Sequence, residues 1–194
     1  MTLRVLGIDP GLTRCGVGVV DVSSDRTATL VAVDVIQTDK SAPLERRLLD
    51  IGAGLEAILD EFEPAAVSLE RVFAQQNLHS VMGVAQASGV ALLLSARRNL
   101  SVGLHTPTEV KAALTGHGGA NKKQLGAMVA RILRLDAVPT PADASDALAL
   151  AICHAWRQGF TPPTPTGTLT PAQEAWRAAE RSTGRTPARP RLDE

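Results

Sequence analysis

The chain has 194 residues, of which 44% are hydrophobic, and it carries 20 basic and 20 acidic side chains. This composition and length are typical of one water-soluble globular domain, and they exclude a disordered chain, a collagen and a coiled-coil rod. No apolar run is long enough to predict a membrane span, and no secretory signal is evident. The two cysteines, Cys15 and Cys153, do not indicate a disulfide scaffold. We therefore expect a cytoplasmic protein with no membrane partner.

The zero net charge conceals a segregation along the chain. Residues 1–70 hold 6 basic and 12 acidic side chains, whereas residues 71–140 hold 8 basic and 2 acidic ones. A basic middle third beside an acidic first third is compatible with a basic surface around an acidic pocket. Charge alone favours side chains that scatter over the folded surface, because asymmetry in sequence need not become asymmetry in space.

Apolar alternation and turn signals predict an α/β fold. Three strands with short links favour an antiparallel meander, a later apolar run at 65–70 is typical of a buried parallel strand, and segment 101–105 is predicted as a further strand. The expected strands are 3–9, 16–22, 29–36, 65–70 and 101–105.

Helical periodicity fills the remaining segments up to residue 157. The expected helices are 43–62, with Pro43 in its first turn, then 81–96, 107–114, 121–135 capped by Asn121, and 142–157. Segment 81–96 is apolar nearly all round, which predicts burial on two sides. Its second side belongs either to the core of one subunit or to a second subunit.

The composition changes near Gly159. Residues 159–194 contain six of the twelve prolines and five arginines, without apolar periodicity. We therefore predict one domain over residues 1–158, followed by a disordered tail over residues 159–194.

Four carboxylates stand where chemistry is expected. Asp9 and Glu70 each end an apolar strand, and parallel neighbouring strands would bring both to one edge of the sheet. Asp143 and Asp146 lie three residues apart near the start of the last helix, hence on one face. Acidic groups in a first turn also favour the helix dipole, which accounts for Asp143 better than for the pair.

Four carboxylates in one pocket would repel each other unless hard cations bind them. Oxygen-only ligands favour Mg²⁺ or Mn²⁺, and no cysteine or histidine spacing indicates zinc. Two such ions about 3.5–4 Å apart are the usual clamp for in-line phosphodiester cleavage. Asp9 would be the natural bridging ligand.

The motifs around these carboxylates resemble those of the RuvC family of Holliday-junction resolvases. They read Gly-Ile-Asp-Pro-Gly at 7–11, Glu-Arg-Val-Phe at 70–73 and Ala-Asp-Ala-Ser-Asp-Ala at 142–147. The resemblance, which covers residues 3 to 157, implies a ribonuclease H-like fold with a five-stranded mixed sheet flanked by helices on both faces. It further implies a magnesium-dependent homodimer that cuts four-way DNA junctions, leaves 5′-phosphate and 3′-hydroxyl ends, and works alongside RuvA and RuvB.

The same resemblance assigns roles to individual residues. It implies that Asp9, Glu70, Asp143 and Asp146 bind two metal ions, and that Lys111 and Lys122 act catalytically on nearby phosphates. Phe73 matches an aromatic residue that stacks on an unpaired junction base. Arg71 and Lys123 are expected to add DNA contacts without a catalytic role.

Three alternatives remain at this point. An ATP-binding protein of the actin, sugar-kinase and Hsp70 superfamily would need a second Asp-x-Gly phosphate loop, which we do not find in the sequence. A YqgF-like RNA-processing nuclease would use the same carboxylates. A non-catalytic binding module is not indicated, because all four carboxylates are present.

Overall fold

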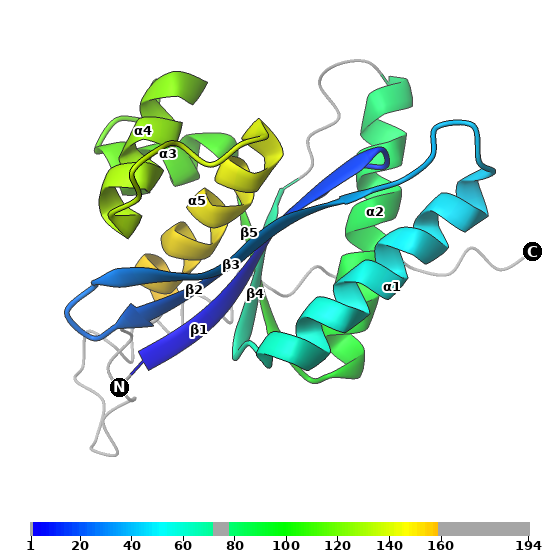
Figure 1. Ribbon diagram of the computed structural model, residues 1–194, viewed down its shortest axis with the longest axis horizontal. Helices are drawn as coiled ribbons and strands as arrows, with labels where there is room; N and C mark the ends of the chain where they lie inside the picture. The colour runs from blue at the N-terminus through cyan, green and yellow to red at the C-terminus, as the bar shows by residue number, and fades with distance from the viewer. Residues whose placement is uncertain (1, 72–77, 159–194) are drawn as a thin grey trace, which may run out of the picture. The chain divides into compact units, whose positions relative to one another are not determined.

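A computed structural model of the chain describes residues 2–71 and 78–158, which belong to one compact unit (Figure 1). The predicted tail, Phe73 and the rest of segment 72–77 lie outside the described residues. Within the described ranges, no helix combines the length and the apolar character needed to cross a bilayer.

A five-stranded sheet forms the centre of the fold, in the order β3-β2-β1-β4-β5. β1 to β3 are antiparallel, whereas β4 runs parallel to β1, and β5 runs parallel to β4. This is the mixed sheet that the sequence predicts, with Asp9 on the middle strand. The strands are β1 (Thr2–Asp9), β2 (Arg14–Ser23), β3 (Ala28–Gln37), β4 (Ala66–Glu70) and β5 (Ser101–His105).

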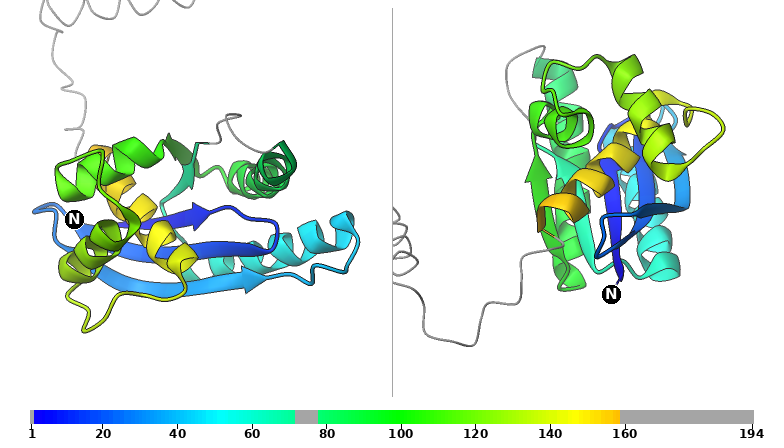
Figure 2. Two further views of the ribbon diagram at one scale, coloured as in Figure 1. Left: turned by 90° about the horizontal axis from the view of Figure 1, so that it is seen from above. Right: turned by 90° about the vertical axis from the view of Figure 1, so that its left-hand side faces the viewer.

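Helices cover both faces of this sheet, as expected (Figures 1 and 2). α1 and α2 pack on one face, and α5 packs on the other, where α3 and α4 lie against it. The helices are α1 (Leu44–Phe62), α2 (Leu78–Arg97), α3 (Pro107–Thr115), α4 (Lys122–Leu133) and α5 (Ala142–Gln158).

Three predicted helix boundaries are corrected by the structure. Pro43 is the N-cap of α1 and not part of its first turn. α2 begins at Leu78, three residues before the predicted start. α4 begins after Asn121, which caps it as predicted and forms a capping box with Gln124. The helix ends at Leu133 and not at the predicted residue 135, because Arg134 adopts a left-handed conformation with φ 55°.

Strand periodicity decides which residues face α5. Along β1, Leu6 and Ile8 pack in the core beneath α1 and α2, whereas Val5 packs in the core beneath α5. Side chains alternate between the two faces of a strand, so Gly7 and Asp9 share the face of Val5. The last residue of β1 is therefore directed toward the layer that contains α5.

Glycines allow α5 to lie directly on the sheet. A Cβ atom on Gly7 would collide with the backbone of Ala147, and one on Gly16 would collide with the backbone carbonyl of Asp143. The Ser68 hydroxyl adds a buried hydrogen bond of 2.8 Å from β4 to the carbonyl of Leu150. Close packing and this bond fix α5 against β1, β2 and β4.

The other end of α5 is attached to the β2–β3 hairpin. The indole Nε1 of Trp156 donates a 3.0 Å hydrogen bond to the carbonyl oxygen of Arg26. The Arg26 guanidinium carbon also lies 4.9 Å from the centroid of the indole ring, which is a cation–π geometry. The hairpin tip and the last turn of α5 are thereby held together.

Candidate active site

Two of the predicted carboxylates lie side by side at one edge of the sheet. The parallel register pairs Ile8 with Leu69. The next residue of each strand, Asp9 in β1 and Glu70 in β4, therefore lies beside the other at the strand ends. Ser68 contacts α5, and Glu70, two residues further, shares its face of β4. Asp9 and Glu70 are both partly buried and face the α5 layer, as the sequence argument requires.

The first turn of α5 brings the other two carboxylates to the same edge. The antiparallel register places Gly16 opposite Asp9, and the backbone of Asp143 lies directly over Gly16. Asp146 follows one turn later on the same face of α5. Both aspartates have side chains that are 22% exposed, so they line a solvent-accessible rim.

The electrostatic state of Asp9 reflects this crowding. Burial raises the pKa of Asp9 to about 7, and the negative charges of Asp146, Glu70 and Asp143 contribute to the same shift. Burial, followed by the charge of Asp146, also raises the pKa of Glu70. A nearby ammonium, Lys122, opposes both shifts. The cluster therefore disfavours its own negative charge and has a strong electrostatic preference for cations.

Two basic side chains contact the aspartates of α5. Lys122 Nζ donates a 3.0 Å hydrogen bond to Asp146 Oδ2, and this contact raises the pKa of the lysine. Arg14 Nε lies 2.9 Å from Asp143 Oδ2. This contact is an ion pair but not a hydrogen bond. The Asp143 oxygen is buried and accepts no hydrogen bond from the described residues. Both arginine and lysine thus supply positive charge to the acidic cluster.

The predicted Lys111 lies in the same neighbourhood. A hollow beside the sheet edge is lined by Lys111 and Lys122 together with Glu70, Asp146 and apolar side chains from α3, α4 and α5. The predicted pair of lysines and two of the predicted carboxylates are thus brought together, although Lys111 and Lys122 come from different helices.

The donor set suits hard divalent cations, but it does not form a finished coordination shell. Among residues 2–71 and 78–158, no three carboxylate, imidazole or thiol groups converge closely enough to hold one ion. One oxygen of Asp143 and one of Asp146 are instead within 3.0 Å of Arg14 and Lys122. Oxygen-only carboxylates are the ligands that Mg²⁺ prefers, and the Asp143 oxygen without a hydrogen-bond donor can accept a cation.

The remaining predicted contacts are only partly described. Arg71 directly follows β4, is exposed, and donates a backbone hydrogen bond of 2.8 Å to the carbonyl of His105. Lys123 is exposed in the first turn of α4. Phe73 lies outside the described residues, so its predicted stacking role stays a prediction.

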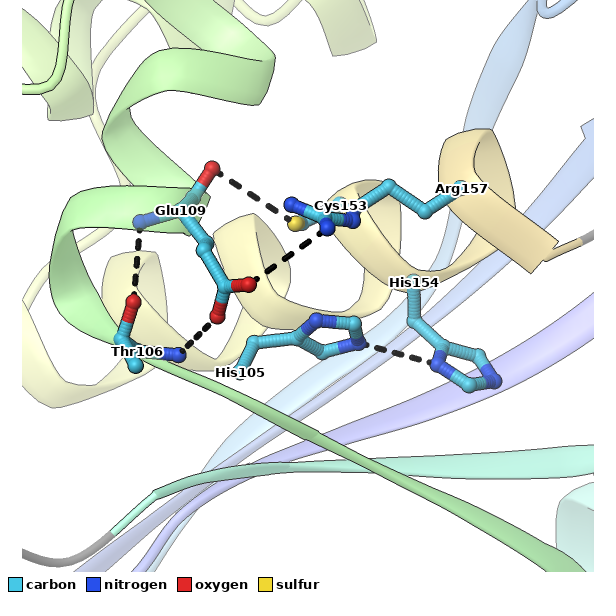
Figure 3. Close-up of polar contacts among 6 residues, drawn as sticks. All are labelled: His105, Thr106, Glu109, Cys153, His154 and Arg157. Atoms are coloured by element: carbon cyan, nitrogen blue, oxygen red, sulfur yellow. Dashed lines mark hydrogen bonds and ion pairs between the residues drawn. The ribbon is translucent and has the colours of Figure 1, made fainter. Parts of the chain in front are cut away.

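A buried polar cluster behind the site was not predicted from the sequence. His105 Nε2 and His154 Nδ1 lie 3.0 Å apart, which joins the end of β5 to α5 (Figure 3). Burial and the neighbouring His105 lower the pKa of His154 to about 4. Burial, followed by the charge of Arg157, lowers the pKa of His105 as well. At neutral pH the pair is therefore uncharged.

The same cluster anchors α3 to α5. Glu109 forms a capping box with Thr106 and an ion pair of 3.4 Å with Arg157 (Figure 3). The backbone carbonyl oxygen of Glu109 also lies 4.0 Å from Cys153 Sγ. The ends of β5, α3 and α5 are thus fixed to one another behind the carboxylates.

Sequence reasoning missed the Arg14 contact and the histidine pair for different reasons. Arg14 stands five residues after Asp9 and three after the end of the 7–11 motif, which is a signal that it belongs to the site. His105 ends its strand as Asp9 and Glu70 end theirs, but only the three-dimensional packing shows that His154 meets it.

The sheet order, the helical layers on both faces and the acidic edge define a ribonuclease H-like protein. The chain belongs to the RuvC family. The model of this family, described as crossover junction endodeoxyribonuclease RuvC, matches residues 5–154.

Individual relatives agree with this assignment. A protein from Leifsonia xyli named crossover junction endodeoxyribonuclease RuvC is 62% identical, over 98% of each chain. A protein of that name from Streptomyces griseus is 61% identical over 80% of this chain and 76% of its own length. The solved structure of Thermus thermophilus RuvC in complex with Holliday junction substrate is 37% identical. The match covers 79% of this chain and 93% of the Thermus thermophilus chain, with a TM-score of 0.75.

Proposed function

We propose that this protein is a structure-selective endodeoxyribonuclease that resolves four-way DNA junctions by hydrolysing phosphodiester bonds. The observation that carries the proposal is that Glu70, Asp143 and Asp146 lie near enough to Asp9 at one sheet edge for their charges to raise its pKa, in a chain of the RuvC family. The relative from Thermus thermophilus was solved with a Holliday junction, which supports the same substrate here. The products are paired symmetric nicks with 5′-phosphate and 3′-hydroxyl ends.

The four carboxylates would hold two Mg²⁺ ions per site, and Mn²⁺ would substitute for them. Bound there, the metal supplies an activated water and stabilises charge on the leaving oxygen. The chain itself contributes the arrangement of the ligands. The sheet fixes Asp9 and Glu70, and the close packing of α5 on Gly16 fixes Asp143 and Asp146.

The basic side chains around the cluster would bind the DNA backbone. Lys111 and Lys122 line the hollow next to Glu70 and Asp146, where an ammonium group screens the charge of a scissile phosphate. Exposed Arg71 and Lys123 would add phosphate contacts that position the strand. Phe73 would stack on a base next to the cut, a contact worth about 1–3 kcal/mol.

We further propose a homodimer that forms through α2. Helix α2 buries Ala87 and Ala91 in the core of the subunit, while the side chains of Met82, Leu92 and Leu93 remain 56%, 40% and 59% exposed. Large apolar side chains exposed on a helix that is already packed on one side favour a second subunit.

Two further parts of the proposal concern the cellular setting. Cooperation with RuvA and RuvB rests on the family alone. A cytoplasmic location is supported by Cys15 and Cys153, which are both buried free thiols.

The test is cleavage of a synthetic immobile four-way junction, with and without Mg²⁺, beside linear duplex and an RNA–DNA hybrid. Metal-dependent paired nicks near the crossover, with the duplex left intact, are expected. Asp9→Asn should lose this activity, whereas Asp34→Asn, which changes an exposed aspartate of β3, should keep it. Cleavage of the hybrid in preference to the junction would contradict the proposed substrate and favour an RNA-processing nuclease.

A further inference from the structure

A second hollow borders the carboxylate cluster at Asp143. It is lined by residues 11–13 of the β1–β2 loop, by Arg14 at the start of β2, by Arg47 of α1, by Gly83 and Val84 of α2, and by Asp143. We call it the arginine groove. It shares no lining residue with the hollow of Lys111 and Lys122, which reaches the cluster through Glu70 and Asp146. The cluster therefore borders two separate basic hollows, one at Asp143 and the other at Glu70 and Asp146.

Arg47 is held rigidly in this groove. Its Nη2 donates a 2.8 Å hydrogen bond to the hydroxyl of Thr13, and its Nε donates one of 3.0 Å to the hydroxyl of Thr38. Thr38 in turn donates to the carbonyl of Leu12 at 2.6 Å. Both hydrogen-bond partners of Arg47 are neutral. Among the described residues, no carboxylate oxygen lies within 4 Å of the Arg47 guanidinium. Its charge is nevertheless one of the contributions that lower the pKa of Asp39.

Arg14 is the second cation of the groove and is differently placed. Its side chain is 54% exposed, and its guanidinium touches the groove-facing carboxylate of Asp143. Because more than half of the Arg14 side chain is exposed and the pair lacks hydrogen-bond alignment, the guanidinium is free to leave Asp143 for another anion. The groove thus combines one fixed and one exchangeable guanidinium beside the Thr13 hydroxyl.

We propose that the arginine groove binds a backbone phosphate of the DNA strand whose neighbouring phosphate is cut at the carboxylates. Guanidinium groups match phosphate oxygens in geometry and charge, and rigid placement lowers the entropy lost on binding. Arg47 is the preplaced ligand, and Arg14 moves from Asp143 to the phosphate. The strand then runs from the lysine hollow, over the carboxylates, into the arginine groove. This inference rests on the proposed function, because it assigns a subsite to the same substrate.

Equilibrium binding of the full chain to a fluorescent four-way junction, in EDTA and over a range of salt concentrations, tests the proposal without any need for cleavage. Arg14→Gln and Arg47→Gln should each weaken binding about five- to tenfold and should each reduce the salt slope by about one. The matched control is Arg46→Gln, which removes an exposed arginine next to Arg47 that does not line the groove. This variant should bind within about twofold of the wild type.

Single methylphosphonate substitutions near the cut locate the contact. One neutralised phosphate should weaken the wild type and leave Arg47→Gln without further loss. Because Arg47 also braces the β1–β2 loop, Arg14→Gln, which removes none of the hydroxyl contacts of Arg47, keeps the test independent of folding. Wild-type affinity and salt slope in Arg14→Gln, or equal losses in Arg46→Gln, would overturn the proposal.

Failure of the proposed function would look different. The wild type would then bind the junction no better than linear duplex, while both groove variants would still lose affinity for each DNA. That result would retain the phosphate subsite and reject the junction as its substrate.

Discussion

Replacing Gly16 by alanine tests whether the packing of α5 on the sheet sets the geometry of the carboxylates. The new Cβ would lie 2.6 Å from the carbonyl carbon of Asp143, whereas two carbon atoms in contact are about 3.5–4.0 Å apart. The start of α5 must therefore move by about 1 Å. Because a misplacement of about 1 Å can cost about a hundredfold in rate, we expect junction cleavage by Gly16→Ala to fall about a hundredfold.

The assay is single-turnover cleavage of the immobile junction at saturating enzyme and Mg²⁺, together with junction binding in EDTA. Binding should change little, because the phosphate contacts lie on other residues. Overpacking of this kind costs about 1–3 kcal/mol of stability, so the assay temperature must lie well below the melting temperature of the variant.

The matched control is Gly52→Ala in α1. Its Cβ would lie 3.6 Å from Val90, an ordinary van der Waals contact, so cleavage should remain at the wild-type rate. A folded Gly16→Ala protein that cleaves as fast as Gly52→Ala would refute the argument that this close contact positions Asp143.

Three further predictions concern other parts of the molecule. Asp9→Asn should abolish cleavage but leave junction binding in EDTA intact, and substantial residual cleavage would exclude Asp9 as an essential ligand. The pKa of His154, about 4, predicts that the contribution of this side chain to stability is complete above pH 6.5 and falls by about 3 kcal/mol toward pH 4, because the unfolded chain binds the extra proton. The raised pKa of Asp9 acts in the opposite direction in wild type and variant alike. The unfolding free energy of the wild type in urea should therefore fall relative to that of His154→Gln as the pH is lowered from 6.5 to 4. Leu93→Asp should give monomers in sedimentation, whereas Leu49→Asp, equally exposed on α1, should not.

Most of the fold could be predicted because its signals are local. Alternation and helical periodicity locate the strands and helices within a few residues, and Asn121 before a periodic segment predicts the N-cap of α4. The predicted end of α4 was wrong by two residues, because the left-handed residue that ends the helix is Arg134 and not a glycine, so the sequence contains no signal for it.

The candidate site could be predicted in part for a similar reason. Asp9 and Glu70 lie together because strand parity and parallel pairing follow from sequence patterns. Arg47 meets the β1–β2 loop only through the packing of that loop on α1, and His154 meets His105 only through the packing of α5 on β5. Such contacts depend on distances between elements, which periodicity does not encode.

The attachment of Trp156 to the β2–β3 hairpin has a spectroscopic consequence. The chain contains no tyrosine and two tryptophans, Trp156 and Trp176, so Trp176→Phe would leave Trp156 as the single indole fluorophore. Its emission would respond to the cation of Arg26 and to the hydrogen bond at Nε1, both at the opposite end of α5 from Asp143. The intrinsic fluorescence of this protein can therefore report whether DNA at one end of the helix disturbs the other end.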